Sequence, residues 1–307
     1  PYSNYWSDLL QNLHKKEPLF IKQIDLEYGK YLAEITHQFI HKNKLSVDLI
    51  SSHGHTIFHE PKKGLTKQIG DGHIIAQKLK KNVVYDFRTL DVRLGGQGAP
   101  LVPIGDELLF SEYNYCLNLG GFSNISYQHN NERLAYDICP VNIVLNKLAN
   151  RIGVAYDNEG KISKSGSVNN SLLNQLNALP YYSKSHPKSL GNEWVNKFIW
   201  PIIDPLNETT ENLMRTFTEH ISMQIGEKLK KGKCLTTGGG CHNLFLMERI
   251  QFFSNSKLIK TEDDIVNFKE ALIFALLGVL KQREEINTLK SVTGSKRDSS
   301  GGTLICY

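Results

Sequence analysis

Apolar residues recur along this chain with two different periods, which predict helices and strands in alternation. Spacings of three and four residues predict helices at residues 5–13, 23–42, 141–151, 171–179, 212–231, 244–253 and 268–285. Short apolar runs predict strands at residues 47–52, 82–87, 115–119, 122–127, 134–137 and 234–236. The mixture favours an α/β fold that contains βαβ units.

The central stretch YCLNLGGFSNISYQHNNERLAYD contains the first candidate site. Apolar runs on both sides of Gly120 and Gly121, followed by a His-Asn-Asn turn, predict a β-hairpin with Asp137 on its returning strand. Paired glycines let backbone N–H groups approach phosphate oxygens, and an acid placed opposite can act as a general base. The alternative is an exposed hairpin in which the glycines form a bulge and Asp137 caps a helix that begins near Val141. This stretch alone leaves both interpretations open.

The segment FRTLDVRLGGQGAPLVP, which follows the predicted strand at residues 82–87, is a second candidate site. Its charged residues stand just past the carboxyl end of a strand, where open α/β sheets bind ligands, and a glycine-rich loop follows them. A structural salt-bridge loop is the alternative. The residues concerned are Asp86, Arg88, Asp91, Arg93, Gly95, Gly96, Gln97 and Gly98.

A third candidate site is the glycine run that follows the predicted strand at residues 234–236. Gly238, Gly239 and Gly240 lead through Asn243 into a predicted helix, an arrangement that suits a nucleotide. Neither the P-loop nor the dinucleotide fingerprint is present, so a turn without a ligand remains the alternative. Glu270, at the predicted start of the last long helix, is either a helix-dipole partner or a ligand contact.

Composition narrows the class of function. The 307 residues are 40% hydrophobic, enough for one large or two medium domains, and no apolar run has the length of a membrane span. The net charge of +5 comes without an arginine block, which argues against nucleic acid as a partner and is compatible with an anionic small substrate. Five separated cysteines without a C-x-x-C pair indicate reduced core thiols of a cytoplasmic protein. The histidines at 53, 55, 59 and 73 fit no zinc signature, so no protein metal site is predicted.

Nine segments, taken in order, resemble the anhydro-N-acetylmuramic acid kinase family. They are SHGHTIFHEP, TKQIGDG, DFRTLDVRLGGQGAPLVP, NLGGFSNIS, YDICPVN, HPKSLGNEWVN, TTGGGCHN, KEALIFALL and SVTG. The resemblance implies a two-domain actin/hexokinase/Hsp70-like, or ribonuclease H-like, ATPase fold with mixed sheets flanked by helices and a central cleft. We expect a first domain at 1–112, possibly rejoined by 287–307, and a second domain at 113–286.

The resemblance also implies a reaction and its reagents. Members use ATP and Mg²⁺ to open the 1,6-anhydro ring of anhydro-N-acetylmuramic acid with water and to phosphorylate O6. The product is N-acetylmuramic acid 6-phosphate, in cell-wall (murein) recycling. A homodimer in the cytoplasm is the family expectation.

The resemblance assigns a role to each matching residue. Asp137 matches the catalytic base, and Gly120 and Gly121 match the second phosphate loop. Gly238, Gly239, Gly240 and Asn243 match the nucleotide loop. The substrate contacts are expected from His53, Arg88, Asp91, Gly95, Gly96, Gln97, Gly98 and Glu270.

Three departures from the family pattern leave other functions open. The chain starts at Pro1 without a match to the first phosphate loop, M-S-G-T-S-x-D-G, and we expect that loop to lie upstream. Cys139 and Val141 occupy positions that are glycines in many relatives, and His55 stands where glutamine is usual. The alternatives are a catalytically inactive sugar-binding protein of the same fold and a different sugar kinase of the superfamily.

Overall fold

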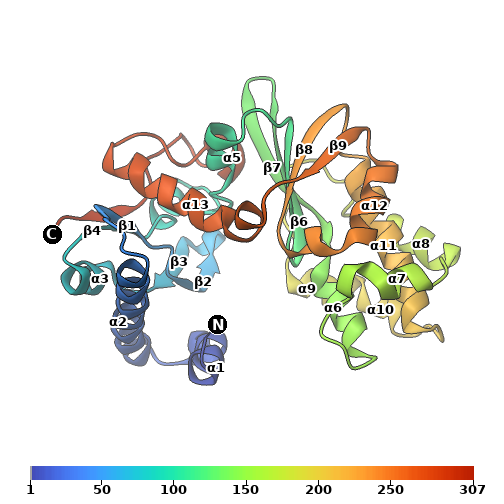
Figure 1. Cartoon of the computed structure of the whole chain (residues 1–307), viewed down its shortest axis with the longest axis horizontal. Helices are drawn as coiled ribbons and strands as arrows, with labels where there is room; N and C mark the ends of the chain where they lie inside the picture. Colours follow the sequence, from blue (N-terminus) through green and yellow to red (C-terminus); the bar gives the residue numbers. More distant parts are fainter. Residues whose placement is uncertain (1) are drawn as a thin grey trace. The chain divides into compact units, whose positions relative to one another are not determined.

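The structure is a computed structural model that describes residues 2–307 and divides the chain into two compact units (Figure 1). The first unit consists of Pro1–Gly105 and Glu270–Tyr307, and the second of Asp106–Lys269. The units divide the chain at 105/106 and 269/270, whereas the predicted domains divide it at 112/113 and 286/287. Helices α5 (Pro103–Leu109) and α13 (Asp263–Gln282) run across these divisions, so their apolar periodicity carries no boundary signal.

The first unit contains a small mixed sheet and a separate hairpin. β4 (Asn82–Tyr85) lies between β1 (Leu49–Ser51), which is parallel to it, and β10 (Thr303–Ile305), which is antiparallel. β2 (His55–Glu60) and β3 (Leu65–Ile69) form the hairpin. The remaining helices of this unit are α1 (Asn4–Asn12), α2 (Pro18–Lys42), α3 (Gly72–Leu79), α4 (Thr89–Arg93) and α14 (Lys290–Thr293).

The second unit is built on a five-stranded sheet in the order β7-β6-β5-β8-β9. The strands are β5 (Tyr115–Leu119), β6 (Phe122–His129), β7 (Glu132–Pro140), β8 (Gly232–Thr237) and β9 (Ser256–Lys260). β6 is antiparallel to both of its neighbours, and the other pairs are parallel. A sheet of this order with its second strand reversed is the arrangement of ribonuclease H-like ATPase domains. The predicted α/β class with mixed sheets is therefore confirmed.

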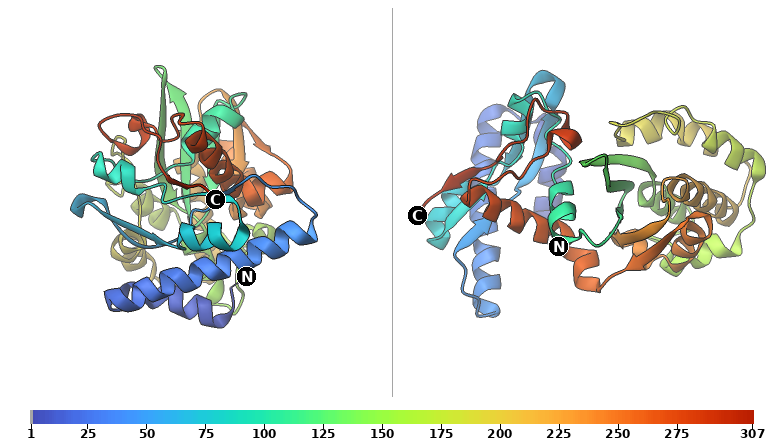
Figure 2. Two further views of the ribbon diagram at one scale, coloured as in Figure 1. Left: turned by 90° about the vertical axis from the view of Figure 1, so that its left-hand side faces the viewer. Right: turned by 90° about the horizontal axis from the view of Figure 1, so that it is seen from above.

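Helices pack beside this sheet and complete the core of the second unit (Figure 2). They are α6 (Asn142–Asn150), α7 (Lys161–Ser165), α8 (Asn170–Asn177), α9 (Asn192–Phe198), α10 (Trp200–Ile203), α11 (Thr210–Gly226) and α12 (Leu244–Phe253). Fully buried Phe217, Ile221 and Ile225 give α11 its inward face.

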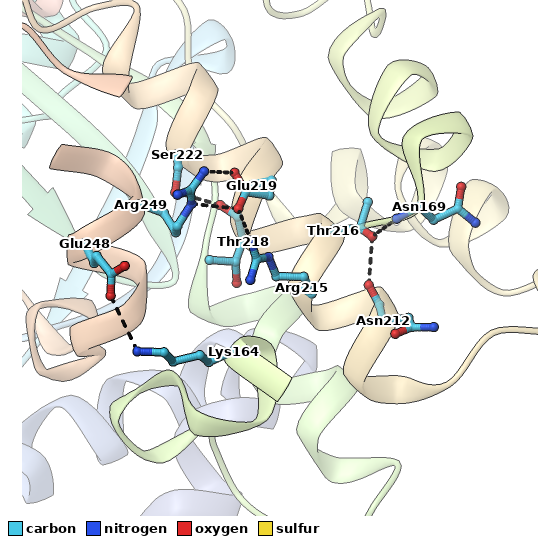
Figure 3. Close-up of polar contacts among 10 residues, drawn as sticks. All are labelled: Lys164, Asn169, Asn212, Arg215, Thr216, Thr218, Glu219, Ser222, Glu248 and Arg249. Atoms are coloured by element: carbon cyan, nitrogen blue, oxygen red, sulfur yellow. Dashed lines mark hydrogen bonds and ion pairs between the residues drawn. The ribbon is translucent and has the colours of Figure 1, made fainter. Parts of the chain in front are cut away.

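A charged contact joins α11 to α12 (Figure 3). Arg249 donates to both oxygens of Glu219, at 2.7 and 3.0 Å, and Arg215 lies 3.0 Å from the same carboxylate. Glu219 is buried, and burial without partners would be costly for a carboxylate. The paired Glu219 therefore fixes α12, the helix that follows the triple-glycine turn.

Several predicted boundaries were wrong. α2 begins at Pro18 because proline is well suited to the first turn of a helix, and Gly232 begins β8 instead of ending α11. α13 begins at Asp263, so Glu270 lies inside this helix and not at its start. The hairpin β2–β3, strand β9 and helix α9 were missed because their apolar patterns are short or interrupted.

Candidate active site

Two glycine turns lie side by side at the carboxyl edge of the five-stranded sheet. β5 and β8 are adjacent parallel strands, and the turns that follow them begin at Gly120 and Gly238. A Cβ atom on Gly240 would lie 2.7 Å from Leu119 Cβ, and one on Gly238 would lie 2.9 Å from the Leu119 carbonyl carbon. No side chain fits at such distances. Gly238 and Gly240 therefore permit the close packing of the two turns.

Gly121 and Gly239 are the open positions of these turns. A Cβ atom on Gly239 would meet nothing within 4 Å, and the nearest atom to one on Gly121 would be Ile143 Cβ at 3.9 Å. Gly239 borders a pocket of about 490 Å³, a volume typical of small-ligand sites. Asn142, Tyr156, Glu159, His242 and Asn243 are among its lining residues. The open glycines thus present bare backbone beside a ligand-sized space.

Asn243 combines a structural contact with a place at the pocket. Its Oδ1 accepts the Leu246 N–H at 2.9 Å and so caps α12. The neighbouring His242 is exposed and lines the same pocket. Contact of Asn243 with a nucleotide stays a prediction, and His242 is an additional candidate that the sequence analysis did not single out.

Asn142 is a second candidate that the sequence analysis missed. Its side-chain amide donates to the carbonyl oxygens of Leu119 and Gly120, at 3.2 and 2.8 Å. A Cβ atom on Gly240 would lie 3.5 Å from the same amide nitrogen. Its position in YDICPVN, directly after the strand that carries Asp137, is a signal that could have identified it.

Asp137 projects from a β-bulge. It pairs with Asn124, whereas Cys139 pairs with the preceding residue Ser123, so Ile138 is the extra residue of β7. Bulges change the direction of neighbouring side chains and are common next to active sites. Val141 is the N-cap of α6 and no side chain caps this helix. The alternative in which Asp137 caps it is therefore wrong.

The segment that leads into α9 holds Asp137 through three hydrogen bonds. The Leu190 N–H donates to Oδ2 at 2.8 Å, the Tyr181 hydroxyl donates to the Asp137 carbonyl at 2.7 Å, and the Asp137 N–H donates to Lys188 O at 3.3 Å. Burial raises the pKa of Asp137, and the Leu190 N–H opposes that rise. Leu190 is the one donor to the carboxylate within residues 2–307, so Oδ1 is left to accept a proton.

In the first unit, Arg88 joins two loops. Its Nε and Nη2 lie 3.1 and 2.8 Å from His53 Nε2, and its Nη1 donates to Gly98 O at 2.6 Å. His53 Nδ1 lies 3.0 Å from Gly54 O, so Nδ1 carries the proton and Nε2 accepts from Arg88. Burial, with the Arg88 charge adding to it, lowers the pKa of His53 to about 4. His53 is thus a neutral acceptor that orients Arg88.

Asp91 supports the glycine loop from inside. It is fully buried, its Oδ2 accepts the Gly98 N–H at 2.7 Å, and its Oδ1 accepts the Thr293 hydroxyl at 2.7 Å. A Cβ atom on Gly96 would lie 2.2 Å from Asp91 Oδ2, so only glycine fits there. Both oxygens are engaged within the protein, and contact of Asp91 with a substrate stays a prediction.

The remaining predicted residues of the first unit are accessible. Gly95, Gln97 and Glu270 are exposed, and the Gln97 N–H donates to Thr293 O at 2.8 Å. Glu270 lies close enough to Arg88 to favour its charged form. No salt bridge of the described residues joins Asp86, Arg88, Asp91 or Arg93 to one another, so this segment is not a salt-bridge loop.

Comparison with known proteins decides the family. The model of the anhydro-N-acetylmuramic acid kinase family matches residues 7–306. This chain belongs to that family. Anhydro-N-acetylmuramic acid kinase of Aliivibrio fischeri is 36% identical, over 92% of this chain and 83% of the relative. The enzyme of the same name from Sulfurimonas denitrificans is 32% identical, over 97% and 88%. The resemblance inferred from the nine segments is confirmed.

Two departures from the family pattern have a structural account. The side chains of Cys139 and Val141 are fully buried in the core of the second unit. The Cys139 N–H donates to Ser123 Oγ at 3.2 Å, and this hydroxyl donates to the Cys139 carbonyl at 3.0 Å. Both substitutions therefore add volume on the core side of the turn after β7.

Two further comparisons complete the description. Among solved structures, the activator of 2-hydroxyisocaproyl-CoA dehydratase from Clostridium difficile, with bound ADPNP, has a TM-score of 0.38 at 16% identity, over 60% of this chain and 66% of that one. Such a likeness is too low to carry a structural argument. Of the helices in residues 2–307, none combines the length and the apolar character needed to cross a bilayer.

Proposed function

We propose that this member of the anhydro-N-acetylmuramic acid kinase family hydrolytically opens the 1,6-anhydro ring of anhydro-N-acetylmuramic acid and transfers the ATP γ-phosphoryl group to O6. The product is N-acetylmuramic acid 6-phosphate, in cell-wall recycling. The observation that carries the proposal is the pair of adjacent glycine turns beside a pocket, in the same sheet as the bulged Asp137. A nucleotide cradle and a base thus belong to one rigid element.

Asp137 is the general base of this proposal. Oδ1 accepts a proton from water as the water oxygen bonds to the anomeric carbon, and the bond from that carbon to O6 breaks. O6 then bonds to the γ-phosphorus and ADP departs. The pKa of Asp137, raised by burial, brings the carboxylate closer to the basicity that proton abstraction needs. Leu190 holds Oδ2 so that Oδ1 keeps one direction.

The glycine turns hold the phosphates of ATP. Bare N–H groups at Gly121 and Gly239 suit phosphate oxygens, while Asn243 and His242 line the space for the rest of the nucleotide. Within residues 2–307 no three His, Cys, Asp or Glu side chains are placed to hold a metal ion together. This suits Mg²⁺, which proteins bind through few carboxylates together with substrate phosphates. Mg²⁺ bound in this way neutralises the charge that develops on the phosphoryl oxygens.

The first unit supplies the sugar contacts in this proposal. Arg88, the exposed Gln97 and Glu270, and the loop of Gly95, Gly96 and Gly98 are the groups that bind the substrate, with His53 behind Arg88. A homodimer and a cytoplasmic location are family expectations that we carry over with the activity.

A direct assay tests the proposal. The full-length protein is incubated with ATP, Mg²⁺ and anhydro-N-acetylmuramic acid in H₂¹⁸O, quenched early, and analysed by mass spectrometry. We expect N-acetylmuramic acid 6-phosphate with one ¹⁸O on the anomeric carbon and none on the phosphate. Absence of product would favour the inactive sugar-binding alternative. Phosphorylation of N-acetylmuramic acid, without ring opening of the anhydro sugar, would favour a different sugar kinase.

A further inference from the structure

The carbonyl groups of the first glycine turn all point toward the start of α6. Asn142 Nδ2 donates to the Leu119 and Gly120 carbonyls, at 3.2 and 2.8 Å, and its backbone N–H reaches the Gly120 carbonyl at 3.3 Å. The next carbonyl, that of Gly121, accepts the N–H groups of Val141 at 2.8 Å and Ile143 at 3.2 Å. Three successive carbonyls therefore have partners on one side of the chain.

This arrangement fixes where the amide groups of the turn point. In a trans peptide the C=O and the N–H of the same unit point in opposite directions. Because Asn142 holds the carbonyls of Leu119 and Gly120, the N–H groups of Gly120 and Gly121 point away from α6. Gly121 is exposed, and no atom within 3.9 Å of its Cβ position would obstruct a ligand. Successive N–H groups on one side form a concavity that binds anions.

We propose that Asn142 is a positioning residue that sets the peptide orientation of the Leu119–Gly121 turn and thereby aims its N–H groups at the nucleotide phosphates. This inference rests on the proposed function. The side-chain amide has two N–H groups, and two carbonyl oxygens take them. Asn142 thus acts through the turn backbone, and its contribution falls on the phosphate part of the nucleotide.

An alanine substitution separates this role from direct contact with the nucleoside. Asn142→Ala removes both donors, and we expect about a 10- to 100-fold loss of ATP and ADP affinity, the scale of one hydrogen bond to a charged group. Adenosine affinity should stay within about twofold, because adenosine has no phosphate. Isothermal titration calorimetry without sugar measures all three ligands. The matched control is Asn146→Ala, which changes the same pocket one helical turn later and has no hydrogen bond to either carbonyl.

Kinetics and stability complete the test. We expect Asn142→Ala to raise the KM for ATP with the KM for the sugar unchanged, and the thermal midpoint to stay near that of Asn146→Ala. Equal losses of ATP and adenosine affinity would overturn the inference and indicate direct nucleoside contact. Unchanged ATP affinity would also overturn it. Failure of the proposed function would instead appear as a wild-type protein that binds ATP and forms no phosphorylated sugar.

Discussion

Two carboxylates, Asp137 and Asp91, each stand beside a glycine-rich turn, and their surroundings differ. Asp91 is fully buried, with one oxygen on the Gly98 N–H and the other on the Thr293 hydroxyl. Asp137 is half-buried, projects from a bulge and receives one donor on Oδ2. A carboxylate with both oxygens occupied stabilises a loop, whereas one with a free oxygen and a raised pKa can exchange protons. Similar sequence surroundings thus yield different uses.

The largest expected effect follows from removing the free oxygen's basicity. Asp137→Asn should lower turnover by about 10²- to 10⁴-fold, the range for a positioned general base. The amide keeps the shape of the side chain and accepts the Leu190 N–H through its oxygen. Steady-state kinetics together with calorimetry of ATP binding measure this, and we expect unchanged ATP affinity. Wild-type turnover in this variant would place the base elsewhere.

Asp137 also predicts the acid limb of the pH profile. The base must be ionised, and its pKa lies above the usual carboxyl range because of burial. Activity should therefore fall on acidification at a higher pH than an exposed aspartate would give. A plot of kcat/KM against pH for the wild type measures the midpoint, with ATP binding over the same range as the control.

The glycines of the nucleotide turn allow the next test. Gly239→Ala adds a methyl group in open space, so we expect an unchanged thermal midpoint and about a 10- to 100-fold loss of ATP affinity as the phosphate loses close backbone contact. Gly240→Ala is the matched control, because its Cβ would lie 2.7 Å from Leu119 Cβ and should lower the midpoint. If Gly239→Ala bound ATP normally, the open position would not face the phosphates.

Asp91→Asn tests the structural half of the comparison. An amide leaves one of the two donors, Gly98 N–H or Thr293 hydroxyl, facing an N–H₂ group, and such a buried mismatch costs about 1–3 kcal/mol. Urea unfolding measures the loss. The fraction that stays folded should keep its turnover within a small factor, whereas Asp137→Asn should show the opposite result.

Sequence patterns reached the elements and the glycine turns because those signals are local. The alternation of apolar runs located the central hairpin, and the Gly-Gly and Gly-Gly-Gly runs located both turns. Family resemblance supplied the role of Asp137, which no local pattern contains. Contacts between distant residues were beyond reach: Leu190 meets Asp137 across 53 positions and Thr293 meets Asp91 across 202. Asn142 was missed because hydrogen bonding to a carbonyl leaves no trace in residue type.

Tyr181 is one of these distant contacts, and its removal should have a moderate effect. Its hydroxyl donates to the Asp137 carbonyl at 2.7 Å, so Tyr181→Phe loosens the backbone that carries the base. We expect turnover to fall about tenfold, the equivalent of one net hydrogen bond, with the KM for ATP unchanged. The variant should retain the acid limb, because the carboxylate keeps its Leu190 partner. Loss of that limb would assign Tyr181 a part in proton transfer.

His53 should give the smallest effect at neutral pH. Its pKa of about 4 keeps it neutral there, so no activity inflection near pH 6.5 should come from this residue. The unfolded chain binds the proton more readily between pH 4 and 6.5, so stability contributed by this site rises with pH in that window. His53→Gln keeps an acceptor for Arg88 and cannot take up that proton, so the variant should lose this part of the pH dependence of unfolding. Urea unfolding at pH 5 and pH 7 measures the difference, with His14→Gln, on the exposed first turn, as the control. An equal pH dependence in wild type and His53→Gln would mean that Arg88 is oriented by another group.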